Sequence, residues 1–217
     1  MGMRINFCCF SLLCGILAAL PGQASPIQAT FTGVNGANAF GYYIGAYYGQ
    51  LDGQNVSPFC DDFANEVNFG QKWTANLSTL TTGSDLSNTR YGDVAGAAQM
   101  YQQIAWLDTQ FSQQSTAQWA DIHATIWQYF DPTAAPTPSS DYWMKQAQQN
   151  YSSIGYDNFR VVTNVGPVAK TGQVQEFITM VPPVATPEPA SAFLIGSSLL
   201  LAAFAVNVFQ KKRGAQR

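Results

Sequence analysis

The sequence predicts an α+β fold: an antiparallel, sandwich-like β-sheet with an inserted group of about three helices, followed by a single C-terminal transmembrane helix. Aromatic and β-branched residues with interspersed glycines fill the first third of the chain, and strand-like runs return late in the sequence. Between them, apolar residues recur at helical spacing. An uncharged run near the end has about the 20 residues that a bilayer span requires.

The predicted domain organisation begins with a signal peptide at residues 1–24. Arg4 precedes an apolar run at residues 7–20, and the small residues Gly22 and Ala24 form a cleavage site. The other predicted parts are an exported globular domain at 25–180, a Pro-rich linker at 181–189, a transmembrane helix at 190–210 and a basic cytoplasmic tail at 211–217. We therefore expect one folded domain of about 160 residues, which is enough to bury a core.

The first predicted β structure is a hairpin. Residues 40–48 are rich in aromatic residues and form its first strand. Asp52 and Gly53 predict the turn, because a type I′ turn needs positive φ angles that these residue types tolerate. Residues 56–63 are then the returning strand.

Helical spacing defines the centre of the chain. The three predicted helices cover residues 93–111, 115–130 and 141–151. Asp93 is a plausible N-cap of the first helix, and Ser115 with Gln118 has the spacing of a capping box for the second. Two late strands are predicted at 159–163 and 173–180, and we expect them to pack with the early hairpin, with the helices on one side.

The predicted exported domain is acidic. All 13 acidic residues of the chain lie between Asp52 and Glu188, whereas half of the 10 basic residues lie in the two ends. Binding to nucleic acid depends on clustered positive charge. No nucleic-acid partner is therefore expected.

A sequence motif follows the predicted domain. It consists of a Pro-rich segment, the uncharged run and a basic cluster, with the residues Thr186, Pro187, Glu188, Pro189, Lys211, Lys212 and Arg213. The two prolines keep their segment extended, and the basic residues act as a membrane stop that stays in the cytoplasm. In this order the parts resemble a PEP-CTERM sorting signal.

This resemblance implies processing at the membrane. An exosortase, which is a membrane-embedded protease or transpeptidase, would recognise the segment as substrate, and the segment itself would have no catalytic role. The expected partners are the exosortase, membrane lipid and exopolysaccharide, because the family occurs in bacteria that make exopolysaccharide. The expected location is the inner membrane with the domain outside the cytoplasm, and then the cell surface or the extracellular space after processing.

Cys60 is the one cysteine that removal of the predicted signal peptide leaves in the chain. An exported domain with a single cysteine cannot form an internal disulfide. The thiol is therefore buried and inert, pairs between molecules, or has a chemical role.

A pattern around Cys60 and His123 resembles a second family, the thioester domains of bacterial surface adhesins. In that family a strand cysteine and a helix glutamine form an internal thioester, which acylates an amine on a target surface. Cys60 matches the cysteine, and Ile126 and Trp127 match an Ile-Trp pair on the helix, but His123 occupies the glutamine position. An imidazole has no carboxamide carbon for the sulfur to attack, so no thioester is expected.

The resemblance still implies that Cys60 and His123 are neighbours, and three hypotheses follow. The first is a nucleophile and base, with Asp61, Asp62 or Asp121 orienting the imidazole. The second is a buried thiol beside a helix histidine, without chemistry. The third is a metal site with those aspartates, but the spacing matches no zinc motif, and no metal or cofactor is expected.

The sequence as a whole favours a non-enzymatic exported protein. One alternative is a surface adhesin or a Cys–His enzyme derived from a thioester-type domain. A second alternative is a carbohydrate-binding module. Sugar-binding proteins use exposed aromatic residues, but the sequence does not show which of its five tryptophans are exposed.

Overall fold

The computed structural model describes residues 26–166 and 173–181. The predicted signal peptide, the transmembrane helix, the basic tail and the linker beyond Val181, which carries the sorting motif, lie outside the described residues. In the part of the chain that is described, no helix combines the length and the apolar character needed to cross a membrane.

Nine strands and four helical segments make up the described structure. In chain order they are β1 (Ile27–Val34), β2 (Asn38–Ala39), β3 (Tyr42–Tyr43), β4 (Tyr47–Leu51), β5 (Gln54–Val56), β6 (Phe59–Cys60), β7 (Lys72–Thr79), α1 (Ala97–Gln110), α2 (Thr116–Gln128), α3 (Ser140–Asn150), η1 (Tyr151–Ser153), β8 (Phe159–Asn164) and β9 (Phe177–Met180). This composition confirms the predicted α+β class with three main helices.

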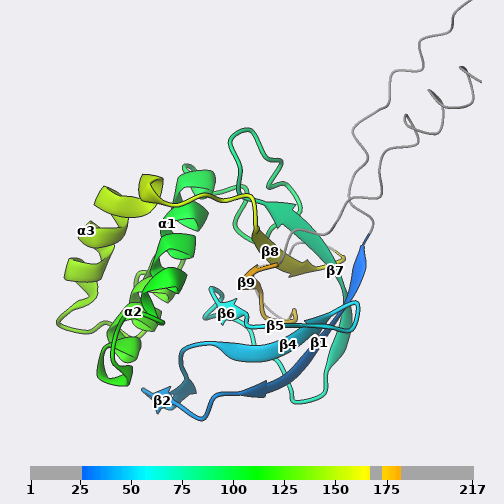
Figure 1. Cartoon of the computed structure of the whole chain (residues 1–217), viewed down its shortest axis with the longest axis horizontal. Coiled ribbons are helices and arrows are strands. Elements are labelled where there is room, and N and C mark those ends of the chain that lie inside the picture. Colours follow the sequence, from blue (N-terminus) through cyan, green and yellow to red (C-terminus); the bar gives the residue numbers. More distant parts are fainter. Residues whose placement is uncertain (1–25, 167–172, 182–217) are drawn as a thin grey trace, which may run out of the picture.

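Seven of the strands form one curled antiparallel sheet in the order β5-β4-β1-β7-β8-β9-β6, and β2 and β3 form a separate small hairpin. The three helices lie together on one side of this sheet (Figure 1). The sandwich-like arrangement expected from the sequence is thus replaced by a single sheet that curls around its own apolar face. The late strands β8 and β9 join the same sheet as the early hairpin, as predicted.

The early hairpin differs from its prediction in two places. The predicted strand at 40–48 is divided, because Gly45 has a φ of 79° and interrupts the extended backbone between β3 and β4. The predicted returning strand at 56–63 is divided as well, since β5 pairs with β4 whereas β6 pairs with β9. The turn between β4 and β5 is confirmed, with Asp52 at φ 48° and Gly53 at φ 80°.

The two strands that sequence patterns missed, β1 and β7, are the longest ones and lie near the middle of the sheet. They pair with each other from Ile27 opposite Ala75 to Thr30 opposite Lys72. Burial alternates regularly along β1, where Ala29, Phe31 and Gly33 are buried, but only loosely along β7, most of whose residues are polar. Their position connects the early hairpin to the late strands.

The predicted helix starts need correction. Helix α1 begins at Ala97 and not at Asp93, because Gly96 precedes it in a left-handed conformation with φ 80°. The proposed capping box of α2 is wrong, since Ser115 makes no side-chain cap bond and only its backbone carbonyl accepts the N–H of Gln118, at 2.9 Å.

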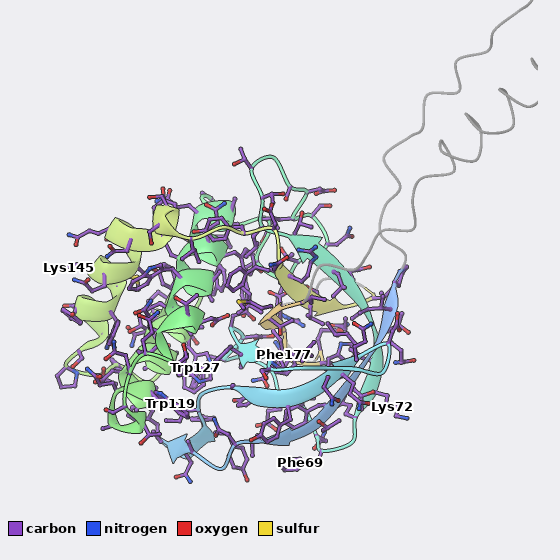
Figure 2. All side chains as sticks on the ribbon, viewed as in Figure 1. Phe69, Lys72, Trp119, Trp127, Lys145 and Phe177 are labelled. Carbon is purple, nitrogen blue, oxygen red and sulfur yellow. The ribbon has the colours of Figure 1, made fainter. Side chains whose placement is uncertain are left out.

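The apolar core of the described residues has two parts. One lies between the helices and the sheet, and includes Tyr101 and Ile126. The other fills the curl of the sheet, and includes Cys60, Trp127 and Phe177. Trp127 and Phe177 both lie in the interior between the helices and the strands (Figure 2). The candidate site lies at this second part of the core.

Candidate functional site

His123 lies on α2 and connects three separate parts of the chain. Its Nδ1 accepts a 2.8 Å hydrogen bond from the backbone N–H of Gly45, so this nitrogen carries no proton. Its Nε2 lies 3.0 Å from the backbone carbonyl of Cys60, and it therefore carries the proton and donates to that oxygen. The ring is neutral and fully buried, and burial lowers the pKa of His123 to about 4.

Cys60 ends the short strand β6, and its side chain is completely buried. The thiol donates to the backbone carbonyl of Asp62, with 3.3 Å between sulfur and oxygen. Burial raises the pKa of the Cys60 thiol well above its ordinary value, and the nearby carboxylate of Asp62 raises that pKa further. The sulfur is therefore held as an unreactive thiol.

The structure brings Cys60 and His123 together, but not in the geometry of a nucleophile and its base. Both ring nitrogens of His123 are engaged by backbone groups, so no lone pair is left to take the thiol proton. For the same reason, none of the aspartates considered from the sequence orients the ring. The arrangement fits a buried hydrogen-bonded link between α2, β6 and the loop before β4.

The described residues also hold no group of three or more His, Cys, Asp or Glu side chains placed to bind a metal ion.

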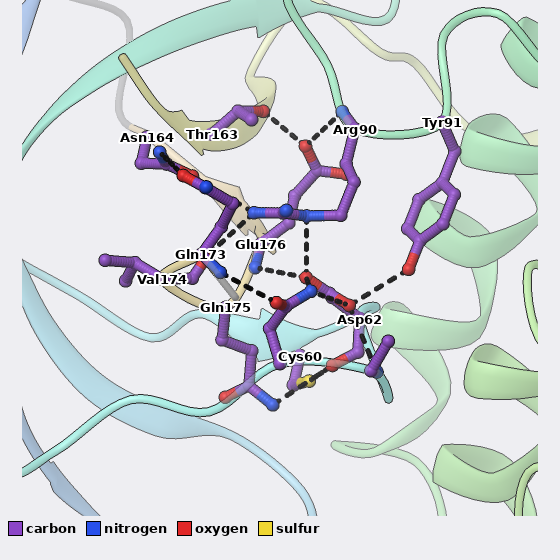
Figure 3. A network of polar contacts seen from close by, with 12 residues as sticks. Cys60, Asp62, Arg90, Tyr91, Thr163, Asn164, Gln173, Val174, Gln175 and Glu176 are labelled. Atoms are coloured by element: carbon purple, nitrogen blue, oxygen red, sulfur yellow. Dashed lines mark hydrogen bonds and ion pairs between the residues drawn. The ribbon is translucent and has the colours of Figure 1, made fainter. Parts of the chain in front are cut away.

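A buried polar network lies beside this link (Figure 3). Asp62 forms an ion pair with Arg90, with 2.7 Å between Oδ2 and Nε, and both side chains are almost fully buried. Asp62 also accepts hydrogen bonds from the Tyr91 hydroxyl at 2.9 Å and from the Asn65 amide at 2.8 and 2.9 Å. A buried ion pair needs such additional bonds to offset the cost of removing its charges from water.

Glu176, the residue just before β9, is the second acid of the network. It accepts from the backbone N–H of Arg90 at 2.7 Å, from the hydroxyl of Tyr101 at 2.6 Å and from the hydroxyl of Thr163. Burial raises the pKa of Glu176 to about 7, and the hydrogen bonds and Arg90 oppose that rise. The network thus joins segments that are far apart in sequence, since Glu176 and Arg90 are separated by 86 positions.

Asp61 differs from its neighbour Asp62. Its side chain is fully buried, and neither carboxyl oxygen has a hydrogen-bond partner among the described residues. Burial, together with the negative charges of Glu176 and Asp62, raises the pKa of Asp61 well above its ordinary value. Both ring nitrogens of His123 are engaged by backbone groups, so Asp61 takes no part in orienting the imidazole.

An open hollow of about 310 Å³ lies beside the link and the network, and it is lined in part by Asn65, Trp127 and Gln175, which contact Asp62 or His123. We call it the aromatic groove, defined by Tyr42, Tyr43, Phe63, Glu66, Phe69, Trp127 and Gln175. Tyr42 and Tyr43 are each 46% exposed and Phe69 is 62% exposed. No sequence pattern indicates this groove, because its rings come from separate loops and strands that only the fold brings together.

The His123 link and the Asp62–Arg90 network hold in place the segments that carry the rings of the groove. Gly45, which donates its backbone N–H to His123, lies two residues after the strand that carries Tyr42 and Tyr43. One helical turn beyond His123, Trp127 lies with its ring centroid 4.5 Å from the imidazole. Asp62 anchors the loop that carries Phe63 and Glu66, and its backbone carbonyl accepts from the Gln175 amide at 3.2 Å.

No protein-family model, curated protein or solved structure matches this chain.

Proposed function

We propose that the chain is an exported bacterial envelope or extracellular-matrix protein, sorted by a PEP-CTERM-type signal and processed by an exosortase, and that its folded domain acts without catalysis. The observation that carries the sorting proposal is the order of parts after residue 185. The residues Pro187, Glu188 and Pro189 precede a long uncharged run, and Lys211, Lys212 and Arg213 follow it. A membrane protease that recognises an extended segment at the outer face would need the parts in this order.

The geometry of His123 supports the non-catalytic part of the proposal. A general base needs a free nitrogen within reach of the proton that it removes. In His123 the unprotonated nitrogen is occupied by a backbone N–H, and the low pKa keeps the ring neutral. Cys60 in turn has a raised pKa and no exposed surface.

The sorting proposal is tested by changing the two prolines of the motif. In the variant Pro187→Ala/Pro189→Ala, the segment loses the constraint that keeps it extended, and the full-length chain should stay in the inner membrane fraction. The matched control is Pro182→Ala/Pro183→Ala, which changes two prolines of the same linker outside the motif. Intact mass and cell fractionation of both variants, in cells with and without the exosortase, provide the measurement.

Three results would support the proposal together: a shortened control protein, an unshortened motif variant, and an unshortened wild type when the exosortase is absent. An unchanged mass and location of the wild type in cells that lack the exosortase would refute it.

A further inference from the structure

Aromatic side chains are concentrated at one place on the described surface. Three of the exposed large aromatic residues, Tyr42, Tyr43 and Phe69, line the aromatic groove, and Phe40 is 48% exposed on the same small hairpin. Soluble proteins rarely leave such rings together in water without a partner. The hollow shape and the volume of about 310 Å³ correspond to a site for a small molecule or a segment of a polymer.

The hairpin that carries these rings is held in a fixed conformation. Phe40 has a φ of 58° and Gly41 a φ of 84°, so a tight turn places a bulky residue in the left-handed region. Such strain persists only where surrounding contacts fix the backbone, and it concentrates at binding sites. Here the Tyr47 hydroxyl donates to the carbonyl of Tyr43 at 2.8 Å, and His123 holds the N–H of Gly45. The rings are therefore arranged before a ligand arrives, which reduces the entropic cost of binding.

The rings of the groove form two groups. Tyr42 packs on Phe63 and Trp127, with ring centroids 5.0 and 5.8 Å away. Tyr43 packs against Phe69, with ring centroids 6.3 Å apart. Two groups of rings beside one hollow provide apolar surfaces for a flat ligand that has more than one ring.

The polar groups at the groove select the chemistry of that ligand. Neither hydroxyl of Tyr42 and Tyr43 has a hydrogen-bond partner in the described part of the chain, and Glu66 is exposed at the same hollow. The Gln175 amide lies there as well. These groups can donate to and accept from hydroxyls, while the only charge among the residues that line the groove is the negative one of Glu66. An anionic polymer or an anionic lipid is thus disfavoured.

From these features we infer that the aromatic groove binds a neutral β-linked glucan-type oligosaccharide. A pyranose in the gluco configuration carries its hydroxyls at the edge and leaves C–H groups on both faces. The C–H hydrogens are slightly positive and face the negative π surfaces of the rings, while the edge hydroxyls meet Glu66, Gln175 and the tyrosine hydroxyls. This inference names a ligand for the domain of the proposed exported protein, but it does not depend on the sorting step.

The test measures binding to the full chain in an amine-oxide detergent, which has no sugar headgroup. Cellohexaose is titrated calorimetrically into the wild type and into Tyr43→Ala, Phe69→Ala and Tyr142→Ala. Tyr142 is the matched control, because it is 56% exposed on α3 and does not line the groove. We expect binding to the wild type and the control, and a loss of affinity of roughly threefold to tenfold in each groove variant. Thermal unfolding checks that all four proteins are folded.

Three results would overturn the inference. The first is the absence of binding to cellohexaose at millimolar concentration, and the second is equal affinity in the groove variants. The third is equal or tighter binding of an oligomannuronate hexamer, which is acidic. Sedimentation without sugar identifies one competing occupant, because a wild type that dimerises and groove variants that do not would assign the groove to a second copy of the chain. Failure of this test leaves the exosortase experiment unaffected, since the sugar titration uses unprocessed protein.

Discussion

Replacing His123 by Phe should change the pH dependence of stability in a way that reveals the buried ring. The pKa of His123 falls from its ordinary value of 6.5 to about 4 in the folded protein. Above pH 6.5 the ring is neutral in both the folded and unfolded states, and its full contribution is present. As the pH falls from 6.5 to 4, the unfolded ring gains a proton and the folded ring does not, so the wild type loses about 3 kcal/mol of unfolding free energy through this residue.

Glu176 acts in the opposite direction over nearly the same range. Its pKa rises from 4.5 to about 7 on folding, so the folded carboxyl keeps its proton while the unfolded one loses it. As the pH falls from 7 to 4.5, the wild type therefore gains about 3 kcal/mol through Glu176. Asp61 and Asp108 add to this gain, because burial raises both of their pKa values. The wild type is expected to become more stable as the pH falls over this range, and the histidine term hides part of the carboxyl term.

His123→Phe removes only the histidine term. The phenyl ring has similar size and no charge, and His123 is itself neutral in the folded protein above pH 4, so the field at the buried carboxyls is unchanged. The variant should be less stable at pH 7.5 by about 2–4 kcal/mol, because the N–H of Gly45 and the carbonyl of Cys60 lose their partners. Between pH 7 and pH 4.5 its stability should then rise more steeply than that of the wild type.

Urea unfolding of both proteins, followed by tryptophan fluorescence at half-unit steps from pH 4 to pH 8, measures the difference. The wild-type advantage should shrink by roughly 3 kcal/mol between pH 7 and pH 4. An advantage that stays constant over this range would refute the assignment of a neutral, buried imidazole at this position. Glu176→Gln is a useful counterpart, since it removes only the Glu176 term and its stability should rise less with acid than that of the wild type.

Three further predictions concern the same region. Arg90→Met should cost about 3–5 kcal/mol of unfolding free energy, measured by urea denaturation, because it leaves the buried carboxylate of Asp62 without its cation; a variant as stable as the wild type would contradict the role of the ion pair. Gly45→Ala should cost at least about 2 kcal/mol more than Gly70→Ala in thermal or urea unfolding, because both glycines have positive φ but only a Cβ at Gly45 would meet other atoms, at 2.7 and 2.8 Å; equal losses would show that the close contact relaxes. Cys60 should react with a thiol reagent only on unfolding, at least about a thousandfold more slowly in buffer than in urea, and rapid labelling of the folded chain would rule out the buried position.

The parts of the fold that were predicted are those with local signals. Asp52 and Gly53 are residue types that tolerate the positive φ angles of their turn, and the stripe around Ile122 and Ile126 defines α2 with nearly correct ends. Strand β1 alternates apolar and polar residues from Ile27 to Thr32, which is a local strand signal that did not enter the prediction. Strand β7 is largely polar and carries no comparable signal, and it is a strand because it pairs with neighbours on both sides. Local preference is weak for such segments, and tertiary pairing decides.

The candidate site was predictable only in part. The closeness of Cys60 and His123 followed from a resemblance to another family, but residue types alone did not indicate that the ring would bind a backbone carbonyl and leave the sulfur alone. Arg90 and Glu176 gave no sequence signal beyond being charges in a chain with few of them. Their contact crosses 86 positions, and only the completed sheet brings them together.

The position of β9 has a consequence for the order in which the domain can form. This strand lies between β8 and β6, and the residue before it supplies a central acid of the buried network. In a chain that emerges N-terminus first, neither the sheet nor the network can be completed until residues 176–180 are available, so the domain must wait in a partly open state for most of its synthesis. In a nascent chain that stops before Phe177, strand β6 has no pairing partner. Cys60 would then be accessible to thiol reagents, whereas in the finished protein its side chain is buried.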